Sequence, residues 1–378
     1  MREMDRMESK NVVVVQNAQD QSTNLPVYQS TNTMRAARLH GIRDLRLENL
    51  LRPTPGPGEV LLEVASVGVC GSDVHYYLEG RIGNQVVTAP IIMGHEFSAR
   101  VAELGAGVGR LDVGQLVAVE PAISCGECEP CQHGHPNLCP GVRFCGTPPV
   151  DGVFAEYTVM PARNCFPLPQ GFSPAESALL EPLGVAIHAV DLAHLKSGYT
   201  VAVLGAGPIG LLIAAVARAS GVSAIYMTEL LAYRRQFALG YVADAALNPD
   251  DTDVVAEIMR LTGGRGVDVA FEAAGAPETP QQAAAVTCPG GKVIVAGIPA
   301  DDTMTMNAST IRHKGLTIKL VRRMKHTYPR AISLVQTGMV DVKSLITHTF
   351  PLERIAEAFE MVAAYEDGVL RAIIQVSA

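Results

Sequence analysis

The chain has 378 residues, enough for roughly two or three domains, and its 48% hydrophobic content allows them sizeable cores. Charged residues make up only 18%, and the formal net charge is −8. The overall basic charge that drives binding to nucleic acids and anionic membranes is therefore absent. We expect neither a nucleic acid nor a membrane as a partner.

Residues 1–33 are rich in Gln, Asn, Ser and Thr and have no sustained apolar period, which predicts a flexible extension. The short apolar run at 12–15 follows acidic residues and does not resemble an export signal, so we expect a cytoplasmic protein. From residue 34 onward, short apolar strands alternate with Gly and Pro turns, which indicates a compact β-rich unit. Examples are 59–67 and 115–119.

From about residue 200 the pattern changes to short apolar runs that alternate with helix-like segments, which predicts a parallel sheet covered by helices. Strands are expected at 200–204, 224–228, 267–272 and 292–296, with a helix at 208–220. Residues 197–217 carry no charge, but glycines and a proline interrupt them, which favours a strand, a turn and a buried helix over a membrane span. Amphipathic segments at 331–336 and 352–364 precede a terminal strand at 371–376.

Eight cysteines in a protein without an export signal indicate metal thiolates rather than disulfides. Four of them form the pattern Cys125-x2-Cys128-x2-Cys131-x7-Cys139, which matches a closed tetrahedral zinc site with four cysteine ligands. An iron–sulfur cluster is disfavoured because the spacing differs from the ferredoxin runs. A nucleic-acid zinc ribbon is disfavoured because the segment has no basic surface. We predict a structural zinc ion.

Residues 201–210 are expected to form a strand that runs into a Gly-x-Gly-x-x-Gly turn and then a helix. In such a motif Gly205 permits the tight turn, Gly207 lets a pyrophosphate approach the backbone, and Gly210 lets helix and strand pack closely. Glu229 follows the next strand at about the 20-residue spacing of an acid that binds the ribose hydroxyls. A carboxylate there repels a 2′-phosphate, so NAD is favoured, although basic residues nearby leave NADP open.

Other metal-binding residue types are dispersed along the chain. Cys70 stands in Gly-Val-Cys-Gly-Ser-Asp-Val-His, His95 and Glu96 stand in Gly-His-Glu, and Glu181 stands in Leu-Glu-Pro-Leu. Taken singly, a cysteine is usually a small buried apolar group and a histidine a buried polar one. Taken together, they make the sequence resemble the zinc-dependent medium-chain dehydrogenases from about residue 34 to the end, and within them the sorbitol (polyol) dehydrogenases.

The resemblance extends beyond this signature. It includes the segments 70–76 (CGSDVHY), 80–84 (GRIGN), 144–149 (FCGTPP), 181–183 (EPL), 205–210 (GAGPIG) and 347–353 (THTFPLE). It implies a catalytic zinc ion held by Cys70, His95 and Glu96, with Glu181 either a fourth ligand or a partner of the zinc-bound water. It also implies that Asp73 orients the imidazole of His95, the usual way in which a ligand tautomer is fixed.

Further roles are implied by family positions. Ser72 matches the group that takes the alcohol proton, with His75 passing it on through water. The positions that match the substrate pocket are Tyr76, Phe144, Thr147 and Arg323. The positions that match cofactor contacts, in addition to the glycines, are Ile209, Glu229, Arg234, Ile298 and Val321.

The fold implied by the resemblance is α/β. A GroES-like, β-rich catalytic domain is expected over 34–183 and 330–378, with the structural zinc loop at 125–139, around a Rossmann domain with a doubly wound parallel sheet over 184–329. The active site would lie in the cleft between the two domains. The resemblance also suggests a homotetramer or homodimer, built partly by extension of the Rossmann sheets.

The expected reaction transfers a hydride from a secondary alcohol of a polyol such as sorbitol or xylitol to NAD, giving the ketose. One departure from the family concerns the substrate, because 322–324 reads Arg-Arg-Met where polyol dehydrogenases typically have Phe-Arg-Tyr. Arg322 and Lys325 favour an acidic or phosphorylated substrate, whereas a neutral polyol stands if Arg322 points to solvent. Threonine, butanediol and sugar or sugar-phosphate dehydrogenases, and a non-catalytic NAD-binding relative, remain alternatives.

Overall fold

The computed structural model describes residues 32–377. The predicted extension over 1–33 lies outside the described residues except for its last two, and the first strand begins at Thr33. Within 32–377, none of the helices has both the length and the apolar character that a membrane crossing requires.

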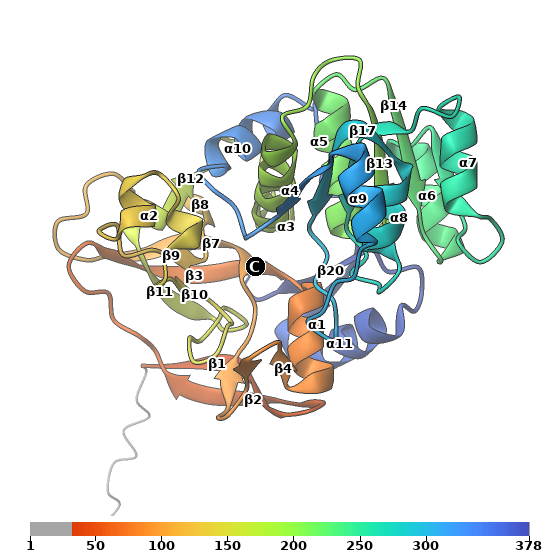
Figure 1. Cartoon of the computed structure of the whole chain (residues 1–378). Coiled ribbons are helices and arrows are strands. Elements are labelled where there is room, and N and C mark those ends of the chain that lie inside the picture. Colours follow the sequence, from red (N-terminus) through yellow and green to blue (C-terminus); the bar gives the residue numbers. More distant parts are fainter. Residues whose placement is uncertain (1–31, 378) are drawn as a thin grey trace, which may run out of the picture. The chain divides into compact units, whose positions relative to one another are not determined.

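The first part of the chain is built on a seven-stranded sheet that also contains the last two strands of the chain (Figure 1). The order is β12-β8-β7-β3-β20-β19, and β11 also pairs with β3. The central strand β3 is buried except at Glu59 and Glu63, because most of its other side chains are apolar on both faces. The strands of this sheet are β3 (Glu59–Gly68), β7 (Glu96–Leu104), β8 (Leu116–Val119), β11 (Tyr157–Pro161), β12 (Cys165–Pro167), β19 (Ile346–Pro351) and β20 (Arg371–Gln375).

Smaller elements complete this β-rich part. A three-stranded sheet consists of β1 (Thr33–Gly41), β2 (Asp44–Leu51) and β6 (Ile91–Ile92), and two short ladders pair β4 (Arg81–Ile82) with β5 (Gln85–Val86) and β9 (Ala122–Ile123) with β10 (Arg143–Phe144). The helical segments are α1 (Gly71–Glu79), α2 (Glu129–Gln132), η1 (Pro136–Leu138), η2 (Ala162–Asn164), α3 (Pro174–Ala178), η4 (Leu352–Arg354) and α11 (Ile355–Ala364).

The other large sheet has six parallel strands in the order β15-β14-β13-β16-β17-β18. The order reverses at β13, which is the doubly wound arrangement of dinucleotide-binding domains. Its strands are β13 (Thr200–Leu204), β14 (Ala224–Thr228), β15 (Ala245–Leu247), β16 (Val267–Glu272), β17 (Thr287–Val295) and β18 (Thr317–Leu320). Its helices are α4 (Leu180–Ala193), α5 (Pro208–Ala219), α6 (Ala232–Tyr241), α7 (Val254–Leu261), α8 (Thr279–Val286) and α9 (Ala308–Lys314).

Alternating side chains of β13 supply two separate cores, one on each face of this sheet. Val201 and Val203 belong to the cluster that contains buried residues of α4 and α5. Ala202 and Leu204 belong to the cluster with buried residues of α7 and α8. Because successive strand residues point to opposite faces, a short and wholly apolar strand is what a sheet covered on both faces requires. The predicted α/β fold class is confirmed.

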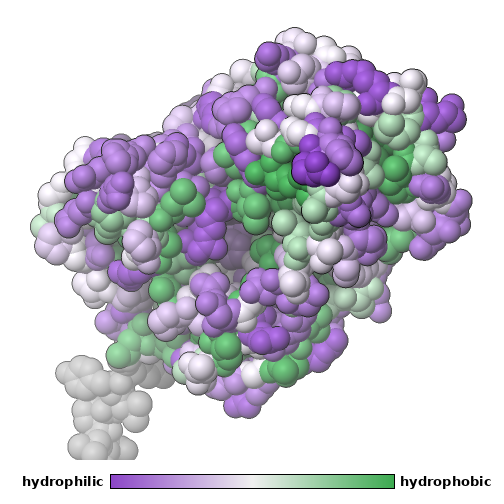
Figure 2. Space-filling view, viewed as in Figure 1, coloured by the Kyte–Doolittle hydropathy of each residue, from purple (hydrophilic) through white to green (hydrophobic). Residues whose placement is uncertain are grey.

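The elements between β18 of the parallel sheet and β19 of the seven-stranded sheet are α10 (Tyr328–Gln336), which contacts α4, and η3 (Lys343–Leu345). The Tyr328 hydroxyl donates a 2.5 Å hydrogen bond to the carbonyl of Val119, and its ring stacks on Phe166 with centroids 4.6 Å apart. Figure 2 shows a hollow in the surface between these parts of the molecule.

Candidate active site

Three of the dispersed metal-binding residues meet where β3 and β7 end next to each other. The antiparallel register pairs Gly68 with Glu96, so the end of β3 lies beside the start of β7. Cys70 follows β3 as the N-cap of α1, and His95 precedes β7 by one residue. Within the described residues, one ligand atom each of Cys70, His95 and Glu96 lies within 4.8 Å of the others. Strand pairing therefore forms a three-donor cluster.

Asp73 holds this cluster in place from the first turn of α1. It is buried, and it accepts hydrogen bonds from the backbone N–H groups of Cys70 (3.0 Å) and Gly94 (3.1 Å). Its Oδ1 also lies 3.5 Å from Nδ1 of His95. Burial lowers the pKa of His95, but the charges of Asp73 and Cys70 outweigh it, so that the pKa is raised overall. A carboxylate beside Nδ1 keeps the proton on that nitrogen, which leaves the lone pair of Nε2 free to bind a metal ion.

The carboxylate of Glu96 is fully buried and faces a buried arginine. Nη1 of Arg371, on β20, lies 2.8 Å from Oε2 of Glu96 and donates to the carbonyl of Val69 at 2.7 Å. Oε1 of Glu96 has no hydrogen-bond partner among the described residues. An unpartnered buried carboxylate oxygen next to a thiol and an imidazole fits a cation, and this donor set is one that zinc accepts.

Glu181 lies in the first turn of α4 and is buried, but it is not one of the three residues whose ligand atoms converge. Burial raises the pKa of Glu181 to about 8, against the opposing charge of His95 and with the added repulsion of Glu96. The group is therefore close enough to the cluster to respond to its charges. Its role as a ligand or as a partner of the ligands stays a prediction.

The four cysteines of the predicted zinc loop also converge. Their sulfur atoms all lie within 4.8 Å of one another, with 3.5 Å between those of Cys139 and Cys125 and 4.0 Å between those of Cys125 and Cys131. A tetrahedral site with Zn–S distances of about 2.3 Å places sulfur atoms about 3.8 Å apart. Backbone N–H groups of Glu127 and Cys128 lower the pKa of Cys125 to about 6, which favours the thiolate. The residues fit a zinc ion with no open position.

Replacing Cys128 with Ser is expected to remove one zinc ion per chain and to lower the stability by several kcal/mol, because a structural zinc ion contributes its binding energy to folding. Metal analysis and thermal unfolding of the purified protein measure both effects. The matched control is Cys288→Ser, which changes a buried cysteine outside the cluster. An unchanged zinc content in the Cys128 variant would contradict the structural zinc site.

The glycine-rich turn lies between β13 and α5, at the carboxyl edge of the parallel sheet. Gly205 has φ +105°, a conformation that side chains disfavour, and Gly207 is the N-cap of α5. A Cβ on Gly210 would lie 2.0 Å from the carbonyl oxygen of Gly205, so the helix approaches the turn more closely than any other residue allows. Ile209 is half-buried in the first turn of the same helix. This backbone presents N–H groups at a helix N-terminus, which suits a pyrophosphate.

Glu229 follows β14 and is held beside the glycine turn. Its Oε2 accepts a hydrogen bond from the N–H of Ala206, and its Oε1 accepts one from the N–H of Leu231, both at 3.1 Å. Nη1 of Arg234 lies 3.9 Å from Oε2, and both side chains are about nine-tenths buried. Arg235 donates instead to the carbonyls of Glu229 and Leu230. The carboxylate is therefore fixed in place, and the guanidinium of Arg235 is engaged with the backbone.

Two more predicted cofactor residues lie just beyond neighbouring strands of this sheet. Ile298 follows β17 and is 50% exposed, and Val321 follows β18, where its N–H donates to the carbonyl of Val295 at 2.8 Å. The carboxyl ends of the strands, beside the reversal at β13, form the edge at which such sheets bind nucleotides.

Replacing Glu229 with Ala is expected to lower the preference for NAD over NADP by about tenfold or more, because the change removes the charge that repels a 2′-phosphate. The ratio of kcat/KM for the two cofactors measures this preference. Asp244→Ala is the control, since Asp244 is an acid after β14 that pairs with Arg218, away from the glycine turn. A ratio unchanged in the Glu229 variant would refute its assignment to the ribose.

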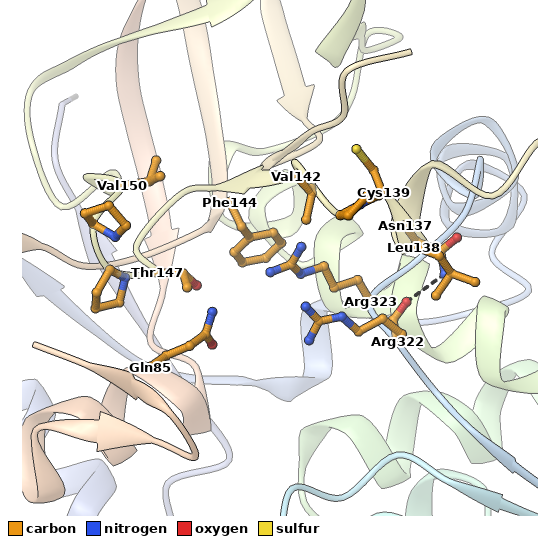
Figure 3. A pocket seen from close by; sticks show the side chains of 13 residues that line it. Gln85, Asn137, Leu138, Cys139, Val142, Phe144, Thr147, Val150, Arg322 and Arg323 are labelled. Carbon is orange, nitrogen blue, oxygen red and sulfur yellow. Dashed lines mark hydrogen bonds between the residues drawn. The ribbon is translucent and has the colours of Figure 1, made fainter. Parts of the chain in front are cut away.

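A cavity of about 460 Å³ lies near the three-donor cluster, although none of the three donors lines it. Figure 3 shows the side chains that do. Three of the four predicted substrate contacts, Phe144, Thr147 and Arg323, are among its lining residues, and their contact with a substrate stays a prediction. The rings of Phe144 and His95 lie 5.2 Å apart between centroids, so Phe144 connects the cavity to the cluster. The fourth predicted residue, Tyr76, is not among the lining residues. It is buried, with its hydroxyl 3.5 Å from Oε1 of the lining residue Gln85.

The structure does not place Ser72 and His75 in this cavity. Both are half-buried on α1 next to Asp73, and Nδ1 of His75 lies 3.4 Å from Glu79. Their proton-transfer role stays a prediction.

Sequence reasoning missed two charged groups near the cluster, Arg371 and Glu120. Arg371 opens an otherwise apolar strand, and Glu120 directly follows the apolar strand β8. Burial raises the pKa of Glu120 to about 7. The sequence signal that could have identified both is a charged residue at either boundary of a mainly apolar strand.

Comparison with known proteins agrees with this geometry. Residues 56–170 match the alcohol dehydrogenase GroES-like domain, and residues 208–337 match the zinc-binding dehydrogenase family. The chain is 40% identical over 341 residues to a sorbitol dehydrogenase of Bacillus subtilis, covering 90% of this chain and 97% of that protein.

Solved structures agree as well. A 2R,3R-butanediol dehydrogenase from Bacillus subtilis superposes with a TM-score of 0.82 at 35% identity, covering 91% of this chain and 100% of that one. A short chain alcohol dehydrogenase from Escherichia coli CFT073, in complex with the cofactor NADH, superposes with a TM-score of 0.85 at 28% identity and covers the same shares.

A GroES-like unit, a doubly wound sheet and a cluster of thiol, imidazole and carboxylate donors define a metal-dependent dehydrogenase. The chain belongs to the zinc-binding alcohol dehydrogenase family, with sorbitol dehydrogenases among its relatives. The prediction of a zinc- and nicotinamide-dependent oxidoreductase is confirmed at the level of the family.

Proposed function

We propose that the protein oxidises a secondary hydroxyl of a polyol of the sorbitol or xylitol type to the ketone. The hydride from the carbinol carbon goes to NAD⁺ and the hydroxyl proton goes to solvent, giving the ketose and NADH. The observation that carries this proposal is the convergence of Cys70, His95 and Glu96 near a cavity whose lining includes Gln85, Asn137, Thr147 and two arginines. The similarity to a sorbitol dehydrogenase along nearly the whole chain supports the polyol.

Cys70, His95 and Glu96, with Glu181 as a fourth ligand or a partner, would hold the catalytic zinc ion. When bound there, zinc supplies Lewis acidity, which lowers the pKa of an alcohol. Asp73 keeps the His95 imidazole in the orientation that the cluster needs. Ser72 accepts the hydroxyl proton, and His75 at the exposed side of α1 passes it to solvent. Phe144 lines the cavity and packs against the His95 ring, so it would place an apolar surface beside the reacting carbon.

Gly205, Gly207 and Gly210 would bind the cofactor pyrophosphate at the start of α5, and Glu229 would bind the adenosine ribose, which favours NAD. NAD supplies the hydride acceptor. Arg234 lies beside Glu229 and stacks on Tyr365 at 4.9 Å. Its placement fits a contact with the cofactor. Ile298 and Val321 would cover the nicotinamide side of the sheet edge.

The proposal extends to assembly and location. The last strand of the parallel sheet, β18, has no partner on its outer side within the described residues, and Leu320 on it is 64% exposed. An unpaired edge of this kind suits pairing with a second copy, and we expect a homodimer or homotetramer, which sedimentation of the purified protein measures. Eight free cysteines fit a reducing compartment, the cytoplasm.

The experiment that tests the function is the initial rate of NAD reduction with sorbitol, xylitol, ribitol, arabinitol, threonine and butanediol, with NADP in parallel and after chelation. Chelator-sensitive turnover of a polyol with NAD is expected. Turnover of threonine or butanediol, without turnover of any polyol, would instead identify the protein as a threonine or butanediol dehydrogenase. Binding of NADH by the zinc-loaded protein without turnover of any substrate would indicate a non-catalytic relative.

A further inference from the structure

The cavity near the three-donor cluster contains two neighbouring arginines and no acidic group. Arg322 and Arg323 line one side of it, as Figure 3 shows, and none of the other described lining residues is an aspartate, glutamate, lysine or histidine. A cavity of about 460 Å³ lies within the size range of small-molecule sites. Besides these two guanidinium groups, of which that of Arg322 belongs to an exposed residue, the lining includes Cys139 of the predicted structural zinc site.

Arg323 is held in place but lacks a partner for part of its guanidinium. The group lies 4.2 Å above the ring of Phe144, and its Nη1 is buried without a hydrogen-bond partner among the described residues. Burial, together with the charge of Arg322, lowers the pKa of Arg323 to about 10, so the group is still charged at neutral pH. A buried donor without an acceptor is costly unless a ligand supplies one.

The backbone of this segment is fixed in an uncommon conformation. Arg323 has φ 54°, in the left-handed region that long side chains rarely adopt. The amide of Asn137, itself a lining residue, donates a 2.9 Å hydrogen bond to the carbonyl of Arg322. Strain of this kind is kept where the surrounding structure enforces it, commonly at binding sites. Here it presents two consecutive arginines to one cavity.

The positive charge along this segment is not neutralised within residues 32–377. Neither Arg322, Arg323 nor Lys325 forms an ion pair with a described carboxylate; the Lys325 amine lies 3.0 Å from Nδ1 of His135 instead. Glu120 and Glu181 offset the charge of Arg323 only at longer range. A few residues further on, by contrast, Arg330 pairs with Asp191 at 2.8 Å. Within this segment, the two arginines that line the cavity are therefore without a carboxylate partner among the described residues.

We propose that the substrate is a polyol that carries an anionic oxyacid group, a phosphate or a carboxylate, and that Arg322 and Arg323 bind this group while the reacting carbinol lies toward Cys70, His95 and Glu96. The inference rests on the proposed oxidation of a polyol and names its substrate class. Guanidinium groups form two-point, charge-assisted hydrogen bonds with both kinds of oxyanion. The reaction itself is unchanged, because the anionic group takes no part in hydride transfer.

The test compares kcat/KM for glucitol, glucitol 6-phosphate and gluconate with the full-length, zinc-loaded enzyme and NAD. At least one anionic compound is expected to exceed glucitol by about tenfold or more, the worth of one charge-assisted hydrogen bond. The preference is expected to shrink with added salt. The two anionic compounds distinguish phosphate from carboxylate. A ratio of anionic to neutral kcat/KM of one or less would overturn the inference.

Variants test whether Arg322 itself, rather than the positive charge of the whole region, causes the preference for an anionic substrate. Arg322→Gln is expected to lower the anionic-to-neutral ratio by about tenfold, and Arg322→Lys is expected to recover part of it. Arg330→Gln, which removes a cation of the same region outside the cavity, is the matched control and should leave the ratio unchanged. A ratio unchanged by Arg322→Gln would also overturn the inference.

Failure of the proposed function would give a different result, namely no reduction of NAD with any of the three compounds. The anion site is then decided by calorimetric titration of glucitol 6-phosphate and of gluconate into the protein saturated with NADH. Binding of either compound that Arg322→Gln weakens by about tenfold supports the site. No binding of either compound, or equal binding by the wild type and the variant, refutes it.

Discussion

Replacing Cys70 with Ala is expected to lower kcat/KM for the best alcohol substrate by about 1000-fold or more. The change removes one of the three converging donors, and the Lewis acidity that zinc supplies is worth several kcal/mol in the transition state, where about 4 kcal/mol corresponds to three powers of ten. Zinc analysis is expected to show one ion fewer per chain. Binding of NADH, followed by its fluorescence, is expected to stay within a factor of about two, because the nucleotide site lies on the other sheet.

The control for this variant is Cys165→Ala, which removes the thiol of a buried cysteine in the same β-rich part, outside the three-donor cluster and the four-cysteine loop. It is expected to retain its zinc and its turnover. Glu96→Ala is a second loss-of-turnover variant, but it also leaves Arg371 buried without its ion partner, so its stability is measured alongside. If Cys70→Ala reduced NAD at the wild-type rate, the assignment of the catalytic cluster would be wrong.

Four of the six strands of the parallel sheet could be predicted because they contain short apolar runs between turns, whereas β15 and β18 were not predicted. Strands β13, β14 and β16 have the expected bounds, and α5 ends one residue earlier than predicted. The strand β17 begins at Thr287 rather than at residue 292. Its first half contains Pro289 and two glycines, one with positive φ, so no apolar pattern announces it, and its pairing with β16 shifts register there.

The active-site cluster could not be derived from local patterns. Cys70 and His95 meet only because β3 and β7 pair with Gly68 opposite Glu96, and that register depends on how the whole sheet packs. Only the family resemblance brought these residues together before the structure. Arg371 contacts the carbonyl of Val69 from 302 residues away in sequence. No motif relates two segments so far apart.

The orientation of Arg322 was the point that the sequence left open. If it pointed to solvent, a neutral polyol would be the simplest substrate. In the structure Arg322 is one of the lining residues of the cavity, next to Arg323, and it is also exposed to solvent, so the neutral polyol stays open as an alternative. The direction of a side chain in a loop depends on the backbone angles. The positive φ of Arg323 could not be expected from the sequence, because residues other than glycine rarely adopt it.

Replacing Gly210 with Ala is expected to destabilise the protein by about 3 kcal/mol and to weaken NADH binding at least about tenfold. The added Cβ would lie 2.0 Å from the carbonyl oxygen of Gly205, which is backbone and cannot rotate away. The helix α5 must therefore shift from the glycine turn, although its buried residues pack against α4 and the sheet. That shift moves the N–H groups that would bind the pyrophosphate.

Gly240→Ala is the matched control, because Gly240 is also helical, in α6, but is exposed and has no atom within 4 Å of an added Cβ. Alanine there is expected to stabilise the protein by about 0.5–1 kcal/mol through its higher helix propensity, without effect on NADH. Urea unfolding and NADH titration of both variants measure these opposite signs. If the Gly210 variant had the unfolding midpoint and the NADH affinity of the wild type, α5 could shift without loss of stability, and the assignment of the glycine turn to the cofactor would be wrong.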